Sequence, residues 1–530
     1  MLTGAAPWPA DRAAAYRRGG YWSGETLADL GREPAREAAG RTALATLQRQ
    51  VSYGQLDRWA DELAGGLRAL GLRAGDRAVV QLPNTPDFVA LCLALFRLGV
   101  LPVLALPAHR RVELAYLCAH TEAKLLVVPD VVAGFDHREL AREIRPTAPA
   151  LERVLVAGDP GEFVALDETR AEPAQVPPPD PDDVALLLLS GGTTQLPKLI
   201  PRTHNDYAYQ LRATAAAMHF DDSGVYLAAL PAAHNAALGC PGVLGAIRAG
   251  GTAVLAASPS PDEVFPLIAR EQVTLTTLMP AFLPLWMKTA PAFGADLSRL
   301  TIEVGGARLE PELAAEAERV LGCRLTRWFG MAEGLLSFTR PEAPAEQRHR
   351  TEGHPLSDDD EIRVVDEHDQ PVPHGEVGEL LTRGPYTING YYRAEEHNAK
   401  TFTADGFFRT GDLVTLRPDG NLVVEGRIKD VVNRGGEKIS AAEVEEHLAA
   451  HPRVHEAAVV AQPDPVLGER TCVFVVAATG DAPSLSDLRS FLGDRGLATY
   501  KLPDAVVSVE SLPYTSIGKV HKAALRARLA

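Results

Sequence analysis

Apolar residues recur at helical spacing in one long segment near the start of the chain. Ser52 and Gln55 open this segment with the capping-box pattern that begins many helices. An apolar residue every three or four positions gives a helix one apolar face. We therefore predict a helix over Gln55–Leu70, whose buried face consists of Leu56, Trp59, Ala60, Leu63, Leu67 and Leu70.

Short apolar runs alternate with such helical patterns. The run RAVVQLP at residues 77–83 predicts a strand, and a helical pattern spans Leu309–Leu321. Further strand-like runs are GVYLAALP (224–231), GTAVLAA (251–257), VTLTTLMP (273–280) and LTIEVGG (300–306). Regular alternation of this kind predicts βαβ units, in which helices cover the faces of sheets.

The most hydrophobic stretch, Phe88–Leu106, has a length that could suggest a membrane span. Arg97 and Pro102 interrupt it, so we predict a buried helix that turns at Gly99 into a strand. The first residues lack a basic start followed by an apolar core, and we expect no secretory signal.

Two changes in composition divide the chain. Residues 171–183 are rich in proline and acid and indicate a linker or surface loop. Beyond residue 427 the pattern is that of a compact α+β unit. Its expected helices are Ala441–Ala450 and Leu485–Gly493, and its strand-like runs are 456–462, 471–478 and 504–513. We predict an α/β fold with a large N-terminal domain (1–427) of βαβ-type sheets and a small, mobile C-terminal domain (428–530).

Charge and cysteine content narrow the class of protein. The 530 residues include 69 acidic and 53 basic side chains, a formal net charge of −16. This balance argues against a general nucleic-acid or anionic-membrane binder. The five cysteines are scattered without a C-x-x-C pair, which fits a reducing compartment and gives no cysteine metal site. We expect a cytoplasmic protein.

The loop SGGTTQLPK (190–198) follows an apolar run, Leu186–Leu189, that predicts a buried strand. Its two glycines can present backbone N–H groups to an anion, and its hydroxyl groups and lysine add donors and charge. This composition favours a polyphosphate ligand, although a polar surface turn would have the same composition. Pro197 and Leu199 stand where a Walker loop needs glycine and a hydroxyl residue, which argues against a P-loop NTPase.

Five further segments combine turn residues with groups that bind nucleotide or metal. They are VGGARL (304–309), WFGMAEG (328–334) with Glu333, RTGDL (409–413) with Asp412, GRIKDVVNRGGEKIS (426–440) and PYTSIGKV (513–520) with Lys519. A carboxylate such as Asp412 can accept two hydrogen bonds from a ribose diol. Each segment alone could be a capping acid, a solvated basic loop or a frayed tail, whereas the ordered set is specific.

In this order the segments resemble the adenylate-forming superfamily, which includes acyl-CoA synthetases, firefly luciferase and the adenylation domains of nonribosomal peptide synthetases. Within it the chain is most similar to freestanding aryl-acid AMP ligases, which activate 2,3-dihydroxybenzoate or salicylate in siderophore pathways. The segments that carry this likeness are SGGTTQLPKLIPRTHNDY, YLAALPAAHN, PGVLG, FGMAEGL, LLTRGPYTINGYY and GGEKI. Relatives usually have glycine where this chain has Gln195.

The resemblance implies ATP and Mg²⁺ as cofactors and gives roles to particular residues. Glu333 would bind magnesium, Lys429 would be the hinge, and Lys519 would bridge the substrate carboxylate and the α-phosphate. His234, Glu333 and Lys519 are the expected catalytic residues. The expected ATP-binding residues are Ser190, Gly191, Gly192, Thr193, Thr194 and Lys198 for the phosphates, Gly305, Gly306, Ala307, Phe329 and Gly330 for adenine, and Asp412 and Arg427 for ribose.

The resemblance also implies an acyl pocket. Asn235 would donate a hydrogen bond to an ortho hydroxyl group, and His234 would lie at the pocket mouth, although a strand-end histidine bound to backbone is an alternative. Salicylate-activating relatives carry cysteine and leucine where Cys240 and Leu336 stand, and dihydroxybenzoate-activating relatives carry serine and valine. The expected substrate-binding residues are His234, Asn235, Ala236, Gly239, Cys240, Gly306 and Leu336.

Ala236 leaves the size of the acid open. Relatives often have an aromatic side chain there, and its loss would leave a costly void unless something filled it. One hypothesis is a bicyclic acid such as 3-hydroxyquinaldate or quinoxaline-2-carboxylate. The other is that neighbouring side chains collapse inward and salicylate remains the substrate.

The resemblance implies a reaction in two steps. An aromatic acid would react with ATP to give an aryl adenylate, with Lys519 delivered by closure of the C-terminal domain. The acyl group would then pass to the phosphopantetheine thiol of a carrier protein in nonribosomal peptide or siderophore biosynthesis. Because no carrier domain follows Lys519, this partner is expected to act in trans. The alternatives are an aryl-CoA ligase and a non-catalytic nucleotide-binding homologue.

Overall fold

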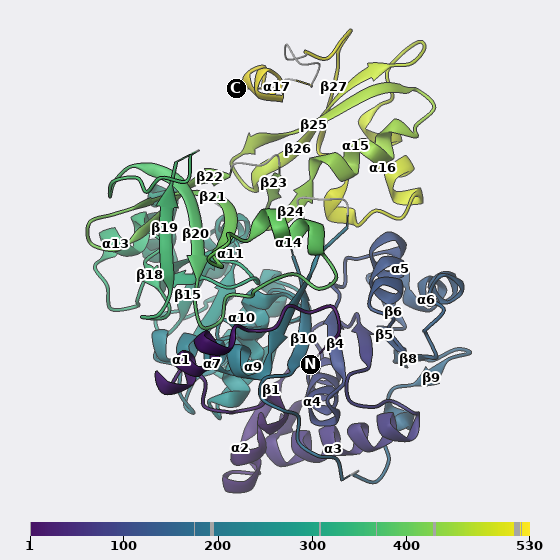
Figure 1. The fold of residues 1–530 in the computed structure, drawn as a ribbon, viewed down its shortest axis with the longest axis vertical. Coiled ribbons are helices and arrows are strands. Elements are labelled where there is room, and N and C mark those ends of the chain that lie inside the picture. The colour runs from purple at the N-terminus through teal and green to yellow at the C-terminus, as the bar shows by residue number, and fades with distance from the viewer. Residues whose placement is uncertain are drawn as a thin grey trace.

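The protein is described by a computed structural model. It covers residues 2–173, 175–190, 196–306, 309–366, 368–427, 431–513, 520 and 522–529, without the side chains of Gly426, Arg427, Ala442 and Ala523. Figure 1 shows a large body with a smaller unit on top of it, and the C-terminal helix lies at the far end of that unit.

The body contains two mainly parallel sheets that pack through a shared core. The first has the order β18 (His354–Pro355), β17 (Leu336–Phe338), β16 (Arg324–Gly330), β15 (Thr301–Gly305), β14 (Leu275–Leu278), β12 (Val225–Ala228), β13 (Thr252–Leu255), β1 (Thr42–Ala45), β2 (Gln50–Ser52). The second has the order β11 (Leu199–Thr203), β10 (Val184–Leu189), β4 (Leu101–Leu104), β3 (Arg77–Val80), β5 (Leu125–Pro129), β8 (Arg153–Ala157), β9 (Val164–Ala165). Antiparallel pairs occur at edges, for example between β10 and β11.

Helices cover both sheets. The helices of the body are α1 (Ala10–Arg18), α2 (Arg32–Glu37), α3 (Tyr53–Ala69), α4 (Pro86–Leu98), α5 (Arg111–His120), α6 (His137–Ile144), α7 (His204–Ala217), α8 (Asn235–Gly239), α9 (Gly242–Arg248), α10 (Pro261–Glu271), α11 (Leu283–Phe293), α12 (Pro311–Leu321), α13 (Ala345–Arg350) and α14 (Glu395–Thr401). The shared core includes residues of α3, α4, α7 and α9. Residues of α10, α11 and α12 form a separate core with the first sheet, and those of α5 and α6 form one with the second.

The body also contains two separate antiparallel sheets. The strands β19 (Glu361–Val365), β20 (Val377–Arg383), β21 (Phe408–Leu416) and β22 (Leu422–Arg427) form a sheet in sequence order, and β6 (Val131–Val132) pairs with β7 (Phe135–Asp136). The smaller unit has the strand order β24 (Glu437–Ser440), β23 (Val431–Arg434), β26 (Gly468–Ala477), β25 (Val454–Asp464), and β27 (Ala505–Ser508) runs parallel to β26. Its helices are α15 (Ala441–Ala449), α16 (Leu485–Asp494) and α17 (Lys522–Ala527).

The sequence-based elements agree closely with this architecture. The predicted helix at Gln55–Leu70 is α3, and its capping box between Ser52 and Gln55 is present. The stretch Phe88–Leu106 is the buried helix α4, which ends at Gly99 with φ +70° before β4. In the described part of the chain, no helix is both long enough and apolar enough to span a membrane.

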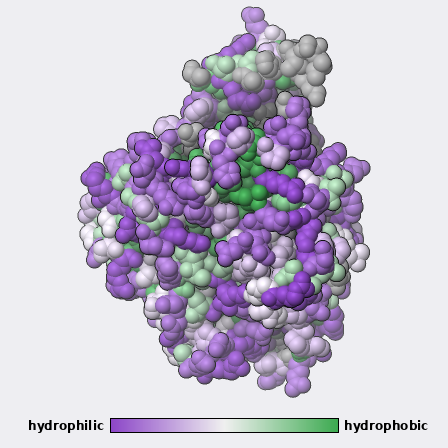
Figure 2. Space-filling view, turned by 60° about the vertical axis from the view of Figure 1, so that its left-hand side comes forward, coloured by the Kyte–Doolittle hydropathy of each residue, from purple (hydrophilic) through white to green (hydrophobic). Residues whose placement is uncertain are grey.

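The proline-rich segment 171–183 is tied to the body at its start. A Cβ atom at Gly65 or Gly66 of α3 would collide with the backbone oxygens of Glu172 and Thr169, respectively. These helix glycines therefore let the connecting chain cross α3 closely. The surface in Figure 2 is mostly hydrophilic, except for a hydrophobic area where the smaller unit meets the body.

Candidate active site

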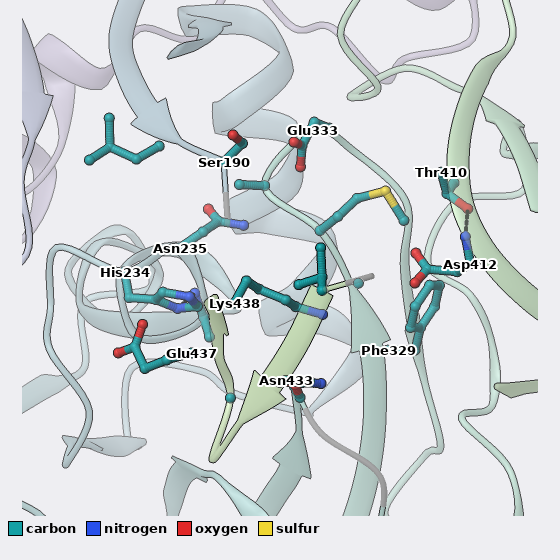
Figure 3. Close-up of a pocket in the computed structure, with 18 of the residues that line it drawn as sticks. Ser190, His234, Asn235, Phe329, Glu333, Thr410, Asp412, Asn433, Glu437 and Lys438 are labelled. Carbon is teal, nitrogen blue, oxygen red and sulfur yellow. Dashed lines mark hydrogen bonds between the residues drawn. The ribbon is translucent and has the colours of Figure 1, made fainter. Parts of the chain in front are cut away.

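A cavity of about 600 Å³ lies between the body and the smaller unit. Most of the site residues predicted from the sequence line this cavity, although they come from distant parts of the chain (Figure 3). These lining residues are Ser190, Lys198, His234, Asn235, Ala236, Cys240, Gly306, Phe329, Gly330, Glu333, Leu336 and Asp412. The cavity therefore joins the predicted nucleotide and acyl sites into one.

Other predicted residues lie elsewhere. Gly239 and Gly305 serve close packing, because a Cβ atom would collide with the Tyr207 hydroxyl group at the first position and with Trp328 at the second. Arg427 pairs with Asp412 through the backbone of β22 and β21, and its side chain is not described. Outside the described residues lie Gly191, Gly192, Thr193, Thr194, Ala307, Lys429 and Lys519.

The two ends of the predicted phosphate loop are fastened to each other. The Ser190 N–H donates to the Lys198 carbonyl at 2.9 Å, and the Lys198 N–H donates to Ser190 Oγ at 3.0 Å. These two hydrogen bonds continue the antiparallel pairing of Leu189 with Leu199. The Lys198 ammonium lies 5.9 Å from the centre of the Tyr391 ring, within cation–π range. The loop ends are therefore held at the cavity by the sheet.

Glu333 is a buried carboxylate on the cavity wall. Its Oε1 accepts a hydrogen bond from the Tyr391 hydroxyl group at 2.7 Å, and its carbonyl accepts one from the Ile388 N–H at 2.8 Å. Tyr391 received no role in the sequence analysis. The described residues contain no group of three or more His, Cys, Asp or Glu side chains able to hold a metal. A single carboxylate beside a phosphate site fits Mg²⁺, which binds one or two carboxylates together with phosphate oxygens.

Asp412 and Phe329 lie together at another part of the cavity (Figure 3). The Asp412 N–H donates to Thr410 Oγ1 at 3.0 Å, which fixes the part of strand β21 that carries the carboxylate. Asp412 is only 3% exposed. A fixed carboxylate beside an aromatic face suits a ribose diol and a stacked base.

His234 begins helix α8 at the acyl end of the cavity. Its Nδ1 accepts a hydrogen bond from the Ala236 N–H at 3.3 Å, so the ring proton resides on Nε2. Burial, with Lys438 nearby, lowers the pKa of His234 to about 4, and the ring is therefore neutral near pH 7. Burial also raises the pKa of the Cys240 thiol well above its ordinary value, which keeps the thiol protonated.

A hydrogen-bond network that the sequence analysis missed supports Asn235. The Tyr207 hydroxyl group donates to Asn235 Oδ1 at 2.8 Å, and Gln210 and Arg202 continue the network behind it. Arg202, Asp206 and Gln210 recur every fourth residue. Asp206 and Gln210 lie four residues apart on helix α7, and this spacing is a signal that could have identified the pair, whereas Arg202 precedes the helix on strand β11.

The smaller unit contributes the opposite wall of the cavity. Asn433, Glu437 and Lys438, from the hairpin β23–β24, line the cavity, and Figure 3 shows the Lys438 side chain reaching toward its centre. Asn433 Nδ2 donates to the Gly306 carbonyl of the body at 2.9 Å. The hairpin belongs to the predicted basic segment 426–440, but no role was predicted for these three side chains.

A buried ion-pair cluster also joins the two parts. Lys501 Nζ lies 2.9 Å from Glu113 Oε1 of the body and 2.8 Å from Glu443 Oε1 of the smaller unit. Val520, the described neighbour of Lys519, instead packs against a cluster that includes Val460 and Phe474. The described members of this cluster do not line the cavity, and Val432 and Ile439 of the hairpin belong to a different core cluster.

Comparisons with known proteins agree with this site. The family model described as AMP-binding enzyme matches residues 31–392, and that of the AMP-binding enzyme C-terminal domain matches residues 443–519. The chain is 52% identical to a 2,3-dihydroxybenzoate-AMP ligase of Bacillus subtilis, over 99% of this chain and 98% of that protein. It is 47% identical to a salicyl-AMP ligase / salicyl-S-ArCP synthetase of Mycobacterium tuberculosis, over 99% and 94% of the two proteins.

A solved structure extends this likeness to the fold. The apo structure of MbtA from Mycobacterium smegmatis superposes with a TM-score of 0.78 at 46% identity, covering 99% of each chain. The predicted α/β architecture with a smaller C-terminal part is confirmed by this match. The chain belongs to the AMP-binding, adenylate-forming enzymes, in the group of freestanding aryl-acid AMP ligases.

Proposed function

We propose that this enzyme activates an ortho-substituted aromatic acid with ATP and then transfers the aryl group to the phosphopantetheine thiol of a separate carrier protein. One observation carries the proposal. A single cavity holds the anchors of the phosphate loop, the Glu333 and Asp412 carboxylates, and the buried pocket around Asn235 and Cys240. These groups suit triphosphate, magnesium, ribose and an aryl ring, respectively.

The first half-reaction has to overcome repulsion between anions. A carboxylate is a poor nucleophile toward a polyphosphate because both carry negative charge, so cations must neutralise them while they are held in line. Lys198 and the Ser190 hydroxyl group would hold the phosphates, and Glu333 would hold Mg²⁺, which neutralises phosphate charge when bound. Lys519 would place its ammonium between the carboxylate and the α-phosphate.

The second half-reaction would use the arrangement of the smaller unit described above. The hairpin carrying Asn433 and Lys438 lines the cavity, whereas Val520 packs against a cluster whose described residues do not line it. Delivery of Lys519 would therefore require the C-terminal domain, residues 428–530, to turn about Lys429 relative to residues 1–427. Neutral His234, which lines the cavity, would lie beside the aryl carbonyl, where its Nε2–H could donate to the carbonyl oxygen.

A pathway role and a location follow from this chemistry. The relative from M. tuberculosis is named as a salicyl-S-ArCP synthetase, and we extend a carrier partner of that kind to this chain. The product would be an aryl thioester for nonribosomal peptide or siderophore assembly, formed in the cytoplasm, where ATP is available.

The test is acid-dependent exchange of labelled pyrophosphate into ATP. The panel contains salicylate, 2,3-dihydroxybenzoate, 3-hydroxyquinaldate and quinoxaline-2-carboxylate, which separates the two pocket sizes. Glu333→Gln and Lys519→Ala should each lower exchange about 100-fold while the protein stays folded. No exchange with any aromatic acid would refute the proposal.

The acceptor is tested separately. A carrier protein bearing phosphopantetheine and free coenzyme A are each supplied to enzyme that has already formed the adenylate. The proposal expects the carrier to be acylated at least about 10-fold faster at equal concentration, because a protein partner adds surface contacts to the same arm. Faster acylation of coenzyme A would make this chain an aryl-CoA ligase.

A further inference from the structure

The amide of Asn235 has a fixed direction, and the groups behind the pocket set it. An asparagine side chain has one accepting end and one donating end of nearly the same shape, so its neighbours decide which end faces a ligand. Asn235 Oδ1 accepts from the Tyr207 hydroxyl group at 2.8 Å and lies 3.4 Å from Gln210 Nε2. Nδ2 lies 3.7 Å from Cys240 Sγ, on the side of the cavity (Figure 3).

Tyr207 alone could not set this direction. A phenol hydroxyl group can donate or accept, so it would tolerate either orientation of the amide. Burial keeps the pKa of Tyr207 well above its ordinary value, which leaves the hydroxyl group protonated and able to do both. The group that decides must be able only to donate.

Gln210 meets this requirement because both of its ends are fixed. Its Oε1 accepts from the Arg202 guanidinium at 2.9 Å, and a guanidinium can only donate. Its Nε2 donates to the Gly239 carbonyl at 2.8 Å, and a carbonyl can only accept. A reversed Asn235 would therefore oppose its own N–H₂ group to that of Gln210.

Arg202 is held just as firmly. Its Nε donates to Asp206 Oδ1 at 2.7 Å, and its remaining nitrogen donates to the Ala332 carbonyl at 3.0 Å, next to Glu333. Arg202 and Gln210 are both 0% exposed, so water cannot substitute for either partner. The chain of donors from Arg202 through Gln210 to Asn235 thus has a single direction.

We propose that Gln210 is a positioning residue that makes the pocket offer only a donor to the ortho position, so that the enzyme selects acids whose ortho group accepts a hydrogen bond. The inference rests on the proposed aryl-acid activation. A phenol oxygen or a ring nitrogen beside the carboxyl group accepts. An aniline nitrogen, whose lone pair is delocalised into the ring, offers mainly N–H donors and opposes Asn235 Nδ2.

The test uses pairs of acids matched in size. Salicylate is compared with 2-aminobenzoate, and quinoline-2-carboxylate with indole-2-carboxylate, by the kcat/KM of pyrophosphate exchange. In the pair that fits the pocket, the accepting acid should be favoured about 100-fold, because a buried donor set against another donor leaves both without a partner. Benzoate, which has no ortho group, should fall between salicylate and 2-aminobenzoate.

Variants separate positioning from general damage. Gln210→Met frees the Asn235 amide to turn over, so the preference should shrink to less than about 10-fold, mainly through better use of the donating acid. Tyr207→Phe keeps Gln210 and should lower the rate without changing the ranking. Thr214→Val is the matched control, because Thr214 Oγ1 bonds only backbone carbonyls, of Gln210 at 2.7 Å and of Leu211, and the variant should retain the wild-type ratio.

The outcomes are distinct. Equal use of the accepting and donating acids by the wild type, or an unchanged ratio in a folded Gln210→Met variant, overturns the role of Gln210 while leaving aryl-acid activation intact. Absence of exchange with every acid overturns the proposed function itself.

Discussion

Two buried cations stabilise different regions of this enzyme, and their partners differ in kind. Arg202 takes all of its partners from the body, where Asp206, Gln210 and the Ala332 carbonyl surround it. Lys501 joins the body to the smaller unit through Glu113 and Glu443. One region is closed within a single part of the molecule, and the other exists only while two parts touch.

The choice of side chain fits each region. The planar guanidinium of arginine donates along fixed directions and can orient several acceptors at once, as the pocket requires. The ammonium of lysine is a compact charge that meets carboxylates from many directions. The proposed rotation of the C-terminal domain would make and break this contact, and a compact charge could serve there without exact alignment. Arg202 therefore suits a region in which hydrogen bonds must point in fixed directions. Lys501 suits a contact between two parts of the molecule that the proposed rotation would separate.

The largest expected effect is on stability after Arg202→Met. The variant leaves Asp206 buried without its cation, and breaking such a pair costs about 3–5 kcal/mol. Lys501→Met should cost less than half as much, because Glu113 and Glu443 can regain water when the two parts separate. All tryptophans lie at or before residue 328, so fluorescence during urea unfolding reports on the body. Equal losses for the two variants would remove the distinction between the regions.

A third buried group, Glu303 on β15, has no cation among its hydrogen-bond partners. Its Oε2 accepts from Thr277 Oγ1 at 2.9 Å, and its Oε1 has no hydrogen-bond partner among the described residues. Burial raises the pKa of Glu303 to about 8. The unfolded carboxyl group loses its proton near pH 4.5 and the folded one near pH 8. The free energy of unfolding should therefore fall as pH rises between these values, by up to about 1.4 kcal/mol per pH unit.

Glu303→Gln should remove this dependence. The variant should gain stability relative to the wild type as the pH rises from 5 to 8, because an amide has no proton to lose. Urea unfolding at four or five pH values in this range measures the slope. Parallel profiles for the two proteins would show that Glu303 does not titrate in this way.

Lys501→Met should also slow the second proposed half-reaction more than the first. Loss of the cation leaves two carboxylates facing each other, which disfavours the arrangement with the β23–β24 hairpin at the cavity. Transfer to the carrier should slow about 10-fold, equivalent to 1.4 kcal/mol, while pyrophosphate exchange stays within about threefold. Lys522→Met is the control, since Lys522 pairs with Glu445 at 2.7 Å inside the smaller unit. Equal slowing of both half-reactions would contradict the expectation.

The smallest effect is expected for Asn433→Ala. This variant removes one neutral hydrogen bond to the Gly306 carbonyl, worth about 0.5–1.5 kcal/mol, so transfer should slow roughly threefold. Because Asn433 and Lys501 share no partner, their effects should add in the double variant. Single-turnover acylation of the carrier measures both, and a strongly non-additive result would show that the two contacts act as one.

Sequence patterns predicted much of this fold because its periodicities are local. The alternation of apolar runs identified the strands β12 to β15, whereas the cavity side chains were predicted from the resemblance to the adenylate-forming enzymes. No strands were predicted for the antiparallel sheet β19–β22. Its strands β19 and β20 are only partly buried, and a mixed burial pattern carries less periodic signal.

The supporting contacts were missed for physical reasons. Tyr207 and Gln210 lie on a helix whose buried face mixes polar and apolar residues, so their direction toward Asn235 depends on how α7 packs beside α8. Lys501 and Glu113 are separated by 388 positions in the sequence, and no local pattern links them. Lys438 lies in the segment 426–440, which was singled out from the sequence. Only the position of the β23–β24 hairpin beside the body brings its side chain to the cavity.

The position of Glu113 at the start of α5 has one more consequence. Its Oε2 accepts from the backbone N–H of the N-cap residue Arg110 at 3.0 Å, and its Oε1 faces Lys501. The helix cap holds the carboxylate in one rotamer whether or not the ammonium is there. If the C-terminal unit docks as proposed, the Glu113 side chain is already ordered before the contact forms. Only Lys501 then loses side-chain entropy.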